Sequence, residues 1–404
     1  MTLERRTWTA VAGEPAPHRV RARVAPEDIP ATGAWRPEHG PGNRSFVDIG
    51  ALHLEAGGRL PEVVLAYETW GQLNETRDNA VLVCHALTGD SHVTGPAGPG
   101  HVTAGWWSTI VGPGKAIDTD RWFVVAANVL GGCQGSTGPS SSAPDGTPWA
   151  SRFPSITIRD QVAAELELTD RLGIERWAHV VGGSMGGQRV LEWAVTAPDR
   201  VRSIAVIASG AQSTADQIAW GHAQISAIEL DPNFRGGDYY GAPPGHGPHA
   251  GLSLARRIAH TTYRSAEELE TRFGRLPQHA EDPMLGGRFA VQSYLDHHGT
   301  KLALRFDANS YLSLTRAMLT HDVGRDRGGV EAALAEVTAD TLVIAVDSDR
   351  LFLPRESERI AAAVPGAGPV RYVHSPYGHD GFLIEHEQMS RHLGTFLEQV
   401  AARI

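Results

Sequence analysis

The 404-residue chain is poor in cysteine and contains no long apolar run. Its two cysteines, Cys84 and Cys133, are too few for a disulfide framework, so we expect both to be reduced thiols. No stretch approaches the ~20 apolar residues that a membrane-spanning helix requires. The N-terminal region also lacks an apolar segment of signal-peptide length. We therefore expect a cytoplasmic protein with no membrane segment.

Lysine is equally scarce, and the sequence contains only Lys115 and Lys301. Arginine therefore carries almost all of the positive charge. The formal net charge is −10 at pH 7. Nucleic-acid binding depends on basic surfaces that neutralise phosphates, so this balance argues against it. Three histidines, His85, His92 and His101, lie near one another but without the spacing of a metal site. We expect no bound metal and treat them as solvated loop residues.

The apolar pattern predicts an α/β fold, in which a mostly parallel sheet is covered by helices on both faces. Two alternating segments at 46–54 and 62–70 suggest an antiparallel pair that opens the sheet. Further strands are expected at 81–84, 122–126, 177–181, 203–208, 341–346 and 370–374. Helices are expected at 158–172, 188–197 and 388–402. We assign residues 44–210 and 327–404 to this catalytic domain.

Two segments depart from the alternation of strands and helices. Residues 1–43 are rich in proline and arginine, and we expect them to form a flexible N-terminal extension. Residues 211–326 resemble helices joined by turns that are rich in glycine and proline. The expected helices of this segment lie at 214–229, 250–262, 266–273 and 310–319. We interpret it as a helical lid inserted over the strand ends.

One short motif points to chemistry. Gly182 and Gly186 flank Ser184 between an apolar run and a helix-like run, which is the pattern of a nucleophile elbow. Glycine is needed on both sides because side chains there would collide across the sharp turn. Cys133 lies in a glycine-rich loop without such an elbow, so we prefer Ser184 as the nucleophile.

A serine nucleophile needs a base and an acid, which follow it in the order acid then histidine in the α/β-hydrolase fold. Two aspartates follow the strand at 341–346. We favour Asp349, which lies further into the turn, over Asp347, whose position at the strand end suits turn chemistry. His379 lies between closely spaced glycines in a later loop and is the candidate base, whereas His374 belongs to the strand before it.

These residue types have complementary roles. His379 would accept the Ser184 proton and return it to the leaving group, while Asp349 orients the imidazole. The oxyanion that develops in acyl transfer requires backbone donors. We expect one from Met185, which follows the nucleophile, and one from Leu87 in the loop after an early strand.

From about residue 46 onward the chain resembles the homoserine O-acetyltransferase family. The motifs that carry this resemblance lie at residues 85–92, 105–107, 128–133, 135–139, 183–187 and 377–380. The resemblance implies an α/β-hydrolase fold and the transfer of an acetyl group from acetyl-CoA to the hydroxyl of L-homoserine, in methionine biosynthesis. It further implies a ping-pong route through an acyl-serine, no permanently bound cofactor, and a homodimer.

The resemblance also implies acceptor ligands, which fall on Arg256, Asp380 and Tyr263 in this chain. A guanidinium and a carboxylate match the two charges of a free amino acid. The neighbouring Arg257 remains an alternative to Arg256. Tyr263 is alternatively a core aromatic residue of the lid.

Other functions of the same fold remain open. The same three catalytic residues occur in esterases, and related acyltransferases act on serine or other hydroxyl acceptors. A succinyl donor differs from an acetyl donor by one carboxylate, and no sequence rule locates the wall that would distinguish them. A binding protein that retains the fold without catalysis is the remaining class.

Overall fold

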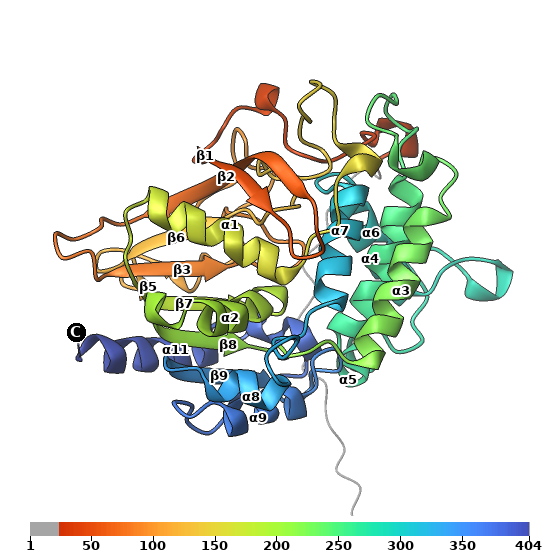
Figure 1. Cartoon of the computed structure of the whole chain (residues 1–404). Coiled ribbons are helices and arrows are strands. Elements are labelled where there is room, and N and C mark those ends of the chain that lie inside the picture. The colour runs from red at the N-terminus through yellow and green to blue at the C-terminus, as the bar shows by residue number, and fades with distance from the viewer. Residues whose placement is uncertain (1–23, 404) are drawn as a thin grey trace, which may run out of the picture.

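In the computed structural model, which describes residues 24–403, eight strands form one continuous sheet in the order β1-β2-β6-β3-β7-β8-β9-β10 (Figure 1). Their bounds are β1 (Ser45–His53), β2 (Arg59–Trp70), β3 (Ala80–Cys84), β6 (Phe123–Ala127), β7 (Trp177–Gly183), β8 (Val201–Ile207), β9 (Asp340–Val346) and β10 (Arg371–Val373). Strand β2 runs antiparallel to both β1 and β6, and all other neighbours are parallel. The predicted antiparallel opening and mostly parallel sheet are confirmed. A short pair, β4 (Val111–Gly112) and β5 (Ile117–Asp118), was missed.

Helices cover both faces of this sheet, as predicted. Successive residues of the fully buried β7 alternate between the two faces, so that Val180 packs into one core and Val181 into the other. The first core includes side chains from α1 (Ile158–Arg171), α2 (Met185–Thr196), α8 (Val330–Ala335) and α9 (Pro354–Ala363). The second core includes α10 (Gly381–Ile384) and α11 (His386–Ala401). Helices α8 and α9 were not predicted.

The segment between β8 and β9 is helical. It contains α3 (Ala215–Glu229), α4 (His249–Tyr263), α5 (Ala266–Phe273), α6 (Ala290–Ala303) and α7 (Ala308–Leu319). These helices gather on one side of the sheet (Figure 1), and we refer to them as the lid. Four of the five had been predicted from the sequence, and α6 had not.

The two ends of the lid lie side by side. The N–H of Ser213 donates to the carbonyl of His321 at 3.0 Å, and the N–H of Val323 donates to the carbonyl of Ala211 at 3.0 Å. The lid therefore leaves the sheet and returns to it at one place.

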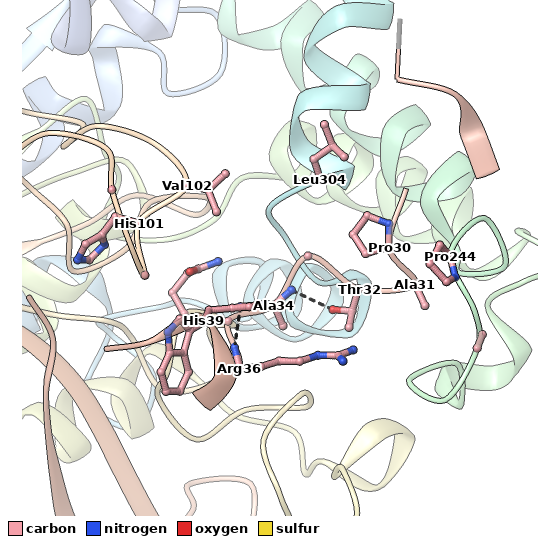
Figure 2. Close-up of a pocket in the computed structure, with 16 residues that line it drawn as sticks. Pro30, Ala31, Thr32, Ala34, Arg36, His39, His101, Val102, Pro244 and Leu304 are labelled. Atoms are coloured by element: carbon pink, nitrogen blue, oxygen red, sulfur yellow. Dashed lines mark hydrogen bonds between the residues drawn. The ribbon is translucent and has the colours of Figure 1, made fainter. Parts of the chain in front are cut away.

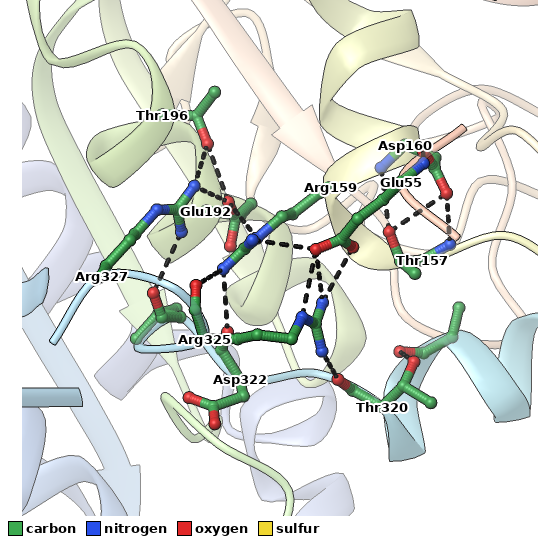
Figure 3. A network of polar contacts seen from close by, with 12 residues as sticks. Glu55, Thr157, Arg159, Asp160, Glu192, Thr196, Thr320, Asp322, Arg325 and Arg327 are labelled. Atoms are coloured by element: carbon green, nitrogen blue, oxygen red, sulfur yellow. Dashed lines mark hydrogen bonds and ion pairs between the residues drawn. The ribbon is translucent and has the colours of Figure 1, made fainter. Parts of the chain in front are cut away.

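Ion pairs fix the returning segment to the β1–β2 turn and to helices α1 and α2 (Figure 3). Arg325, just after α7, pairs with Glu55 of the β1–β2 turn at 2.8 Å, and Arg159 of α1 pairs with the same carboxylate at 2.9 Å. Arg327 pairs with the fully buried Glu192 of α2 at 2.6 Å. Because one partner is buried, solvent screens the Arg327 pair less than an exposed one.

The part of the N-terminal segment that the structure describes is packed against the lid. Ile29, Ala31 and Ala34 are buried, and the hydroxyl of Thr32 donates to Asp307 at 2.8 Å. The expectation of a flexible extension is therefore wrong for this stretch, because its apolar residues find a surface that only the folded lid provides. Residues 1–23 lie outside the described part of the chain.

The helices of the described residues are short or partly polar along their length. None of those between residues 24 and 403 is both long enough and apolar enough to cross a membrane.

Candidate active site

Ser184 stands at the turn between β7 and α2. Its backbone angles, φ 57° and ψ −125°, lie in a region that non-glycine residues rarely adopt. Gly186 permits this turn, because a Cβ there would come within 2.1 Å of the Cys84 carbonyl oxygen. A Cβ on Gly182 would come within 2.7 Å of Gly186 backbone atoms. The glycines thus allow strand and helix to approach closely and raise Ser184 above the strand end.

Ser184, His379 and Asp349 come together from three separate segments. His379 Nε2 lies 2.9 Å from Ser184 Oγ, and His379 Nδ1 lies 2.6 Å from Asp349 Oδ2. All three residues are buried, with exposed fractions of 6%, 3% and 4%. This arrangement can transfer a proton from the serine hydroxyl to the imidazole while the carboxylate holds the ring.

The two candidate aspartates have different surroundings. Asp349 Oδ1 accepts hydrogen bonds from the N–H groups of Leu351 and Phe352, at 2.8 and 2.9 Å, which leaves Oδ2 directed at His379. Asp347 instead lies 2.9 Å from Nδ1 of the exposed His374. The geometry thus brings Asp349 to His379 and separates Asp347 from it.

Opposing effects act on the His379 imidazole. Burial alone lowers the pKa of His379, but the neighbouring Asp349 carboxylate, with smaller contributions from Asp380 and Glu356, raises this pKa above its usual value overall. The rings of Phe352 and Phe382 flank the imidazole, each with its centroid 5.4 Å away. The base is therefore both packed in place and strengthened.

The two expected oxyanion donors come from different segments, Met185 from the start of α2 and Leu87 from the loop after β3. Met185 is the first residue of α2, where a backbone N–H has no carbonyl partner within the helix. The N-terminus of α2 also favours negative charge. Leu87 lines a small cavity together with Tyr263 and Phe352. Both residues are buried, which strengthens any hydrogen bond that their amides make.

The two adjacent arginines of α4 point to different partners. Arg256 donates from Nη1 to Thr88 Oγ1 at 3.3 Å and lies over the Tyr263 ring, 5.1 Å from its centroid. Arg257 pairs with Asp296 of α6 at 3.2 Å. Arg256 therefore faces the loop that carries Leu87, whereas Arg257 is used within the lid.

Asp380 has a partner that the sequence did not indicate. Arg264, just after α4, pairs with it at 3.2 Å between Nε and Oδ2. Burial raises the pKa of Asp380, and the positive charges of Arg264 and Arg256 oppose this shift without cancelling it. Tyr263 is also close, because its ring centroid lies 5.8 Å from that of His379. Lid residues and the residue after the base thus form one wall beside Ser184.

The cysteines are poorly suited to act as nucleophiles. Both are free and buried, and burial raises the pKa of the Cys84 and Cys133 thiols well above the usual value. A thiol that does not ionise near neutral pH is a poor nucleophile.

The histidines of the 85–101 region are buried, so the expectation of solvated loop residues is wrong. His92 Nδ1 lies 2.9 Å from the buried carboxylate of Glu68, and His101 Nε2 lies 3.6 Å from it. These three residues have the donor types of a metal site. However, the two rings are stacked with an interplanar angle of 15°, so their lone pairs do not converge on one point. His101 Nε2 also accepts a hydrogen bond from the Asn43 N–H. We assign no metal to this cluster.

A separate cavity of about 530 Å³ lies away from Ser184 (Figure 2). Residues 30–36 of the N-terminal segment form one wall, with Val102 and Leu304 opposite. None of the residues that line it is Ser184, His379 or Asp349. Cavity volume alone therefore does not locate the chemistry.

Comparisons with known proteins agree with this geometry. Residues 79–385 match a family model described as the alpha/beta hydrolase fold. A homoserine O-acetyltransferase of Thermobifida fusca is 62% identical over 90% of this chain and 96% of its own length. The crystal structure of homoserine O-acetyltransferase from Bacillus anthracis superposes with a TM-score of 0.80, at 27% identity over 88% of this chain and 97% of that chain. The crystal structure of esterase E22 has a TM-score of 0.79 at 26% identity, and covers 88% of this chain and 99% of its own.

Proposed function

We propose that this chain, which belongs to the homoserine O-acetyltransferase family of the α/β-hydrolase fold, transfers the acetyl group of acetyl-CoA to the hydroxyl of L-homoserine. The observation that carries this proposal is the contact chain from Ser184 through His379 to Asp349 beneath a lid that contributes Arg256. We propose that this reaction serves methionine biosynthesis.

In the first half-reaction, Ser184 Oγ attacks the thioester carbonyl of acetyl-CoA as His379 Nε2 takes its proton. Asp349 stabilises the resulting imidazolium. The Met185 and Leu87 amides hold the oxyanion of the tetrahedral intermediate. The carbon–sulfur bond then breaks, the coenzyme leaves as a thiol with the proton from His379, and Ser184 carries the acetyl group.

In the second half-reaction, the homoserine hydroxyl is the nucleophile. His379 accepts its proton as the oxygen attacks the acetyl-serine, and returns a proton to Ser184 Oγ when the ester bond to the enzyme breaks. We propose that Arg256 binds the homoserine carboxylate and Asp380 its ammonium group, with the Tyr263 hydroxyl beside them. Fixing both charged groups places the hydroxyl near the acyl carbon, which favours transfer to it over reaction with water.

The acceptor distinguishes this function from its alternatives. Free CoA release from acetyl-CoA should be fast with homoserine and slow with L-serine or with water alone. Release that is independent of any acceptor would identify an esterase, and preference for L-serine would identify a related acyltransferase. Parallel assays with succinyl-CoA test the donor. Ser184→Ala is the control, because it removes the nucleophile while the elbow accommodates a small side chain.

Two further expectations accompany this function. We propose that the enzyme acts in the cytoplasm and that it forms a homodimer. Met284 and Leu285, between α5 and α6, support a protein contact at the lid, because they are 90% and 85% exposed. Sedimentation of the wild type and of Met284→Glu tests the dimer, since the added charge should shift the protein toward the monomer. An unchanged sedimentation coefficient would exclude this contact.

A further inference from the structure

Glu356 is near enough to Asp349 for their charges to interact, and it has no part in the mechanism described so far. It belongs to the first turn of α9, where Oε1 accepts the Leu353 N–H at 3.0 Å and caps the helix. Its other oxygen, Oε2, turns toward the lid and accepts a hydrogen bond from Gln217 Nε2 at 3.1 Å. A side chain at Gly210 would crowd it, because a Cβ there would lie 2.6 Å from Oε2.

Gln217 connects this carboxyl group to the loop that orients Asp349. Its Nε2 also donates to the Leu351 carbonyl at 2.9 Å, and its Oε1 accepts the Thr214 N–H at the start of α3. Leu351 in turn donates its own N–H to Asp349. The first helix of the lid is thus hydrogen-bonded to the segment that fixes the triad acid.

A helix cap alone does not explain this arrangement. One carboxylate oxygen at the helix start is sufficient for capping, and exposed residues commonly perform that role. Here the second oxygen is directed inward, toward the lid and the triad loop. The extra contact indicates that the position of the carboxylate matters beyond the stability of α9.

We infer, on the basis of the proposed function, that Glu356 is a positioning residue for it: its carboxylate joins the lid to the Asp349 loop and places a second negative charge behind the triad. The Glu356 carboxylate affects the reaction by its electrostatic effect on Asp349 and His379, and it does not contact the substrate. It should make the imidazole a stronger base and stabilise the imidazolium that forms during acylation.

The charged groups around Glu356 are consistent with this role. Burial raises the pKa of Glu356 to about 7, and the like charge of Asp349 adds to the shift. The hydrogen bonds from Leu353 and Gln217, and the charge of Arg355, oppose it. Glu356 is in turn one of the groups that raise the pKa of His379. The carboxyl group therefore changes its charge in the pH range in which the base works, and the two groups titrate as a coupled pair.

Stopped-flow acylation with p-nitrophenyl acetate tests this role independently of the acceptor. Acylation needs neutral His379, so the rate falls on the acid side through the pKa of that residue. In Glu356→Gln the negative charge is lost, the pKa of His379 drops, and the midpoint of the acid limb should move down by about half a unit. The rate on the plateau should fall about three- to tenfold.

Matched variants separate charge from structure. Glu356→Asp retains the charge and should keep the wild-type midpoint. Glu358→Gln changes an exposed acid of the same helix that accepts a hydrogen bond from the Tyr372 hydroxyl, and it should leave the midpoint and the plateau rate unchanged. Gln217→Ala breaks the connection to the lid while the Glu356 carboxyl group is retained, and should slow acylation severalfold even if Glu356→Gln fails to fold.

The outcomes are distinct. A folded Glu356→Gln protein with the wild-type midpoint overturns the charge role, and wild-type acylation by Gln217→Ala overturns the connection through the lid. A wild-type protein that forms no acyl-enzyme overturns the proposed function itself. If the wild-type protein forms the acyl-enzyme and the variants keep its midpoint and its acylation rate, only the inference about Glu356 is overturned.

Discussion

Arg264 and Asp380 form an ion pair at 3.2 Å beside the catalytic base, although Asp380 is proposed to bind the substrate ammonium. Asp380 also lies near Arg256, whose charge affects its pKa. One carboxylate is therefore set between two guanidinium groups. The proposed acceptor carries one negative and one positive group, and these side chains offer a partner of opposite charge for each. Arg264 and Arg256 oppose the effect of burial on the pKa of Asp380 without cancelling it, and a bound ammonium group would add a further positive charge that favours the ionised carboxylate.

The acceptor role of Arg256 can be tested against its neighbour. Arg256→Lys should leave acylation by acetyl-CoA nearly unchanged, but it should lower kcat/KM for homoserine, because a lysine cannot form a bidentate pair. The fall should correspond to a loss of about 2–4 kcal/mol in transition-state stabilisation. Arg257→Lys is the control and should have little effect on either half-reaction. Equal slowing of acylation and transfer in Arg256→Lys would instead assign this arginine to coenzyme binding or to lid folding.

The acid of the triad can be identified by paired substitutions. Asp349→Asn should lower kcat by about 10⁴, because the amide no longer holds the imidazole in the required tautomer. Asp347→Asn should have a small effect, since its partner is the exposed His374. Steady-state acetyl transfer measures both. If the two effects appeared in the reverse order, Asp347 would be the catalytic acid.

The raised pKa of His379 predicts the acid limb of the pH profile. Only the neutral imidazole can accept the Ser184 proton, so acylation should be lost as pH falls through a midpoint above 6.5, the usual value for histidine. Removing the paired charge in Asp349→Asn should move this midpoint down in the residual activity. Burst kinetics between pH 5 and 9 measure it. A wild-type midpoint clearly below 6.5 would show that burial outweighs the Asp349 pair.

The elbow predicts a stability effect at Gly186. Gly186→Ala would place a methyl group 2.1 Å from the Cys84 carbonyl oxygen, so either the strand or the helix must move. We expect a loss of about 1–3 kcal/mol in the free energy of unfolding. Gly368→Ala is the control, because no atom lies within 4 Å of the added Cβ. Denaturant unfolding of both variants measures the difference, and equal midpoints would contradict the crowding described here.

The sequence was most informative where chemistry constrains local geometry. The glycines around Ser184 reveal the elbow, and the strand ends before Asp349 and His379 place both residues at one edge of a parallel sheet. The antiparallel opening and most lid helices follow from apolar periodicity. Helix α6 was missed because few of its residues are buried, so that its apolar pattern is weak.

Contacts between segments that are distant in the chain could not be predicted from the sequence. Glu68 and His92 are 24 positions apart, and nothing in either segment indicates that the carboxylate lies buried against the ring. Arg264 and Asp380 likewise meet only because the lid folds back over the sheet. The packing of the N-terminal segment depends on the same surface. In each case the partner is supplied by tertiary structure and leaves no periodic signal in the sequence.

The paired ends of the lid have a consequence for how this architecture can diversify. Strands β8 and β9 are direct neighbours in the sheet, and the whole insertion departs and returns at one crossing point. The insertion can therefore change in length without altering the register of β8 and β9, provided that Gln217 of α3 keeps its hydrogen bond to the Leu351 carbonyl in the Asp349 loop. The proposed acceptor ligands Arg256 and Tyr263 both belong to the insertion, so acceptor selectivity can be recombined with it as a module, whereas the acyl-enzyme chemistry requires an insertion that keeps the Gln217 contact.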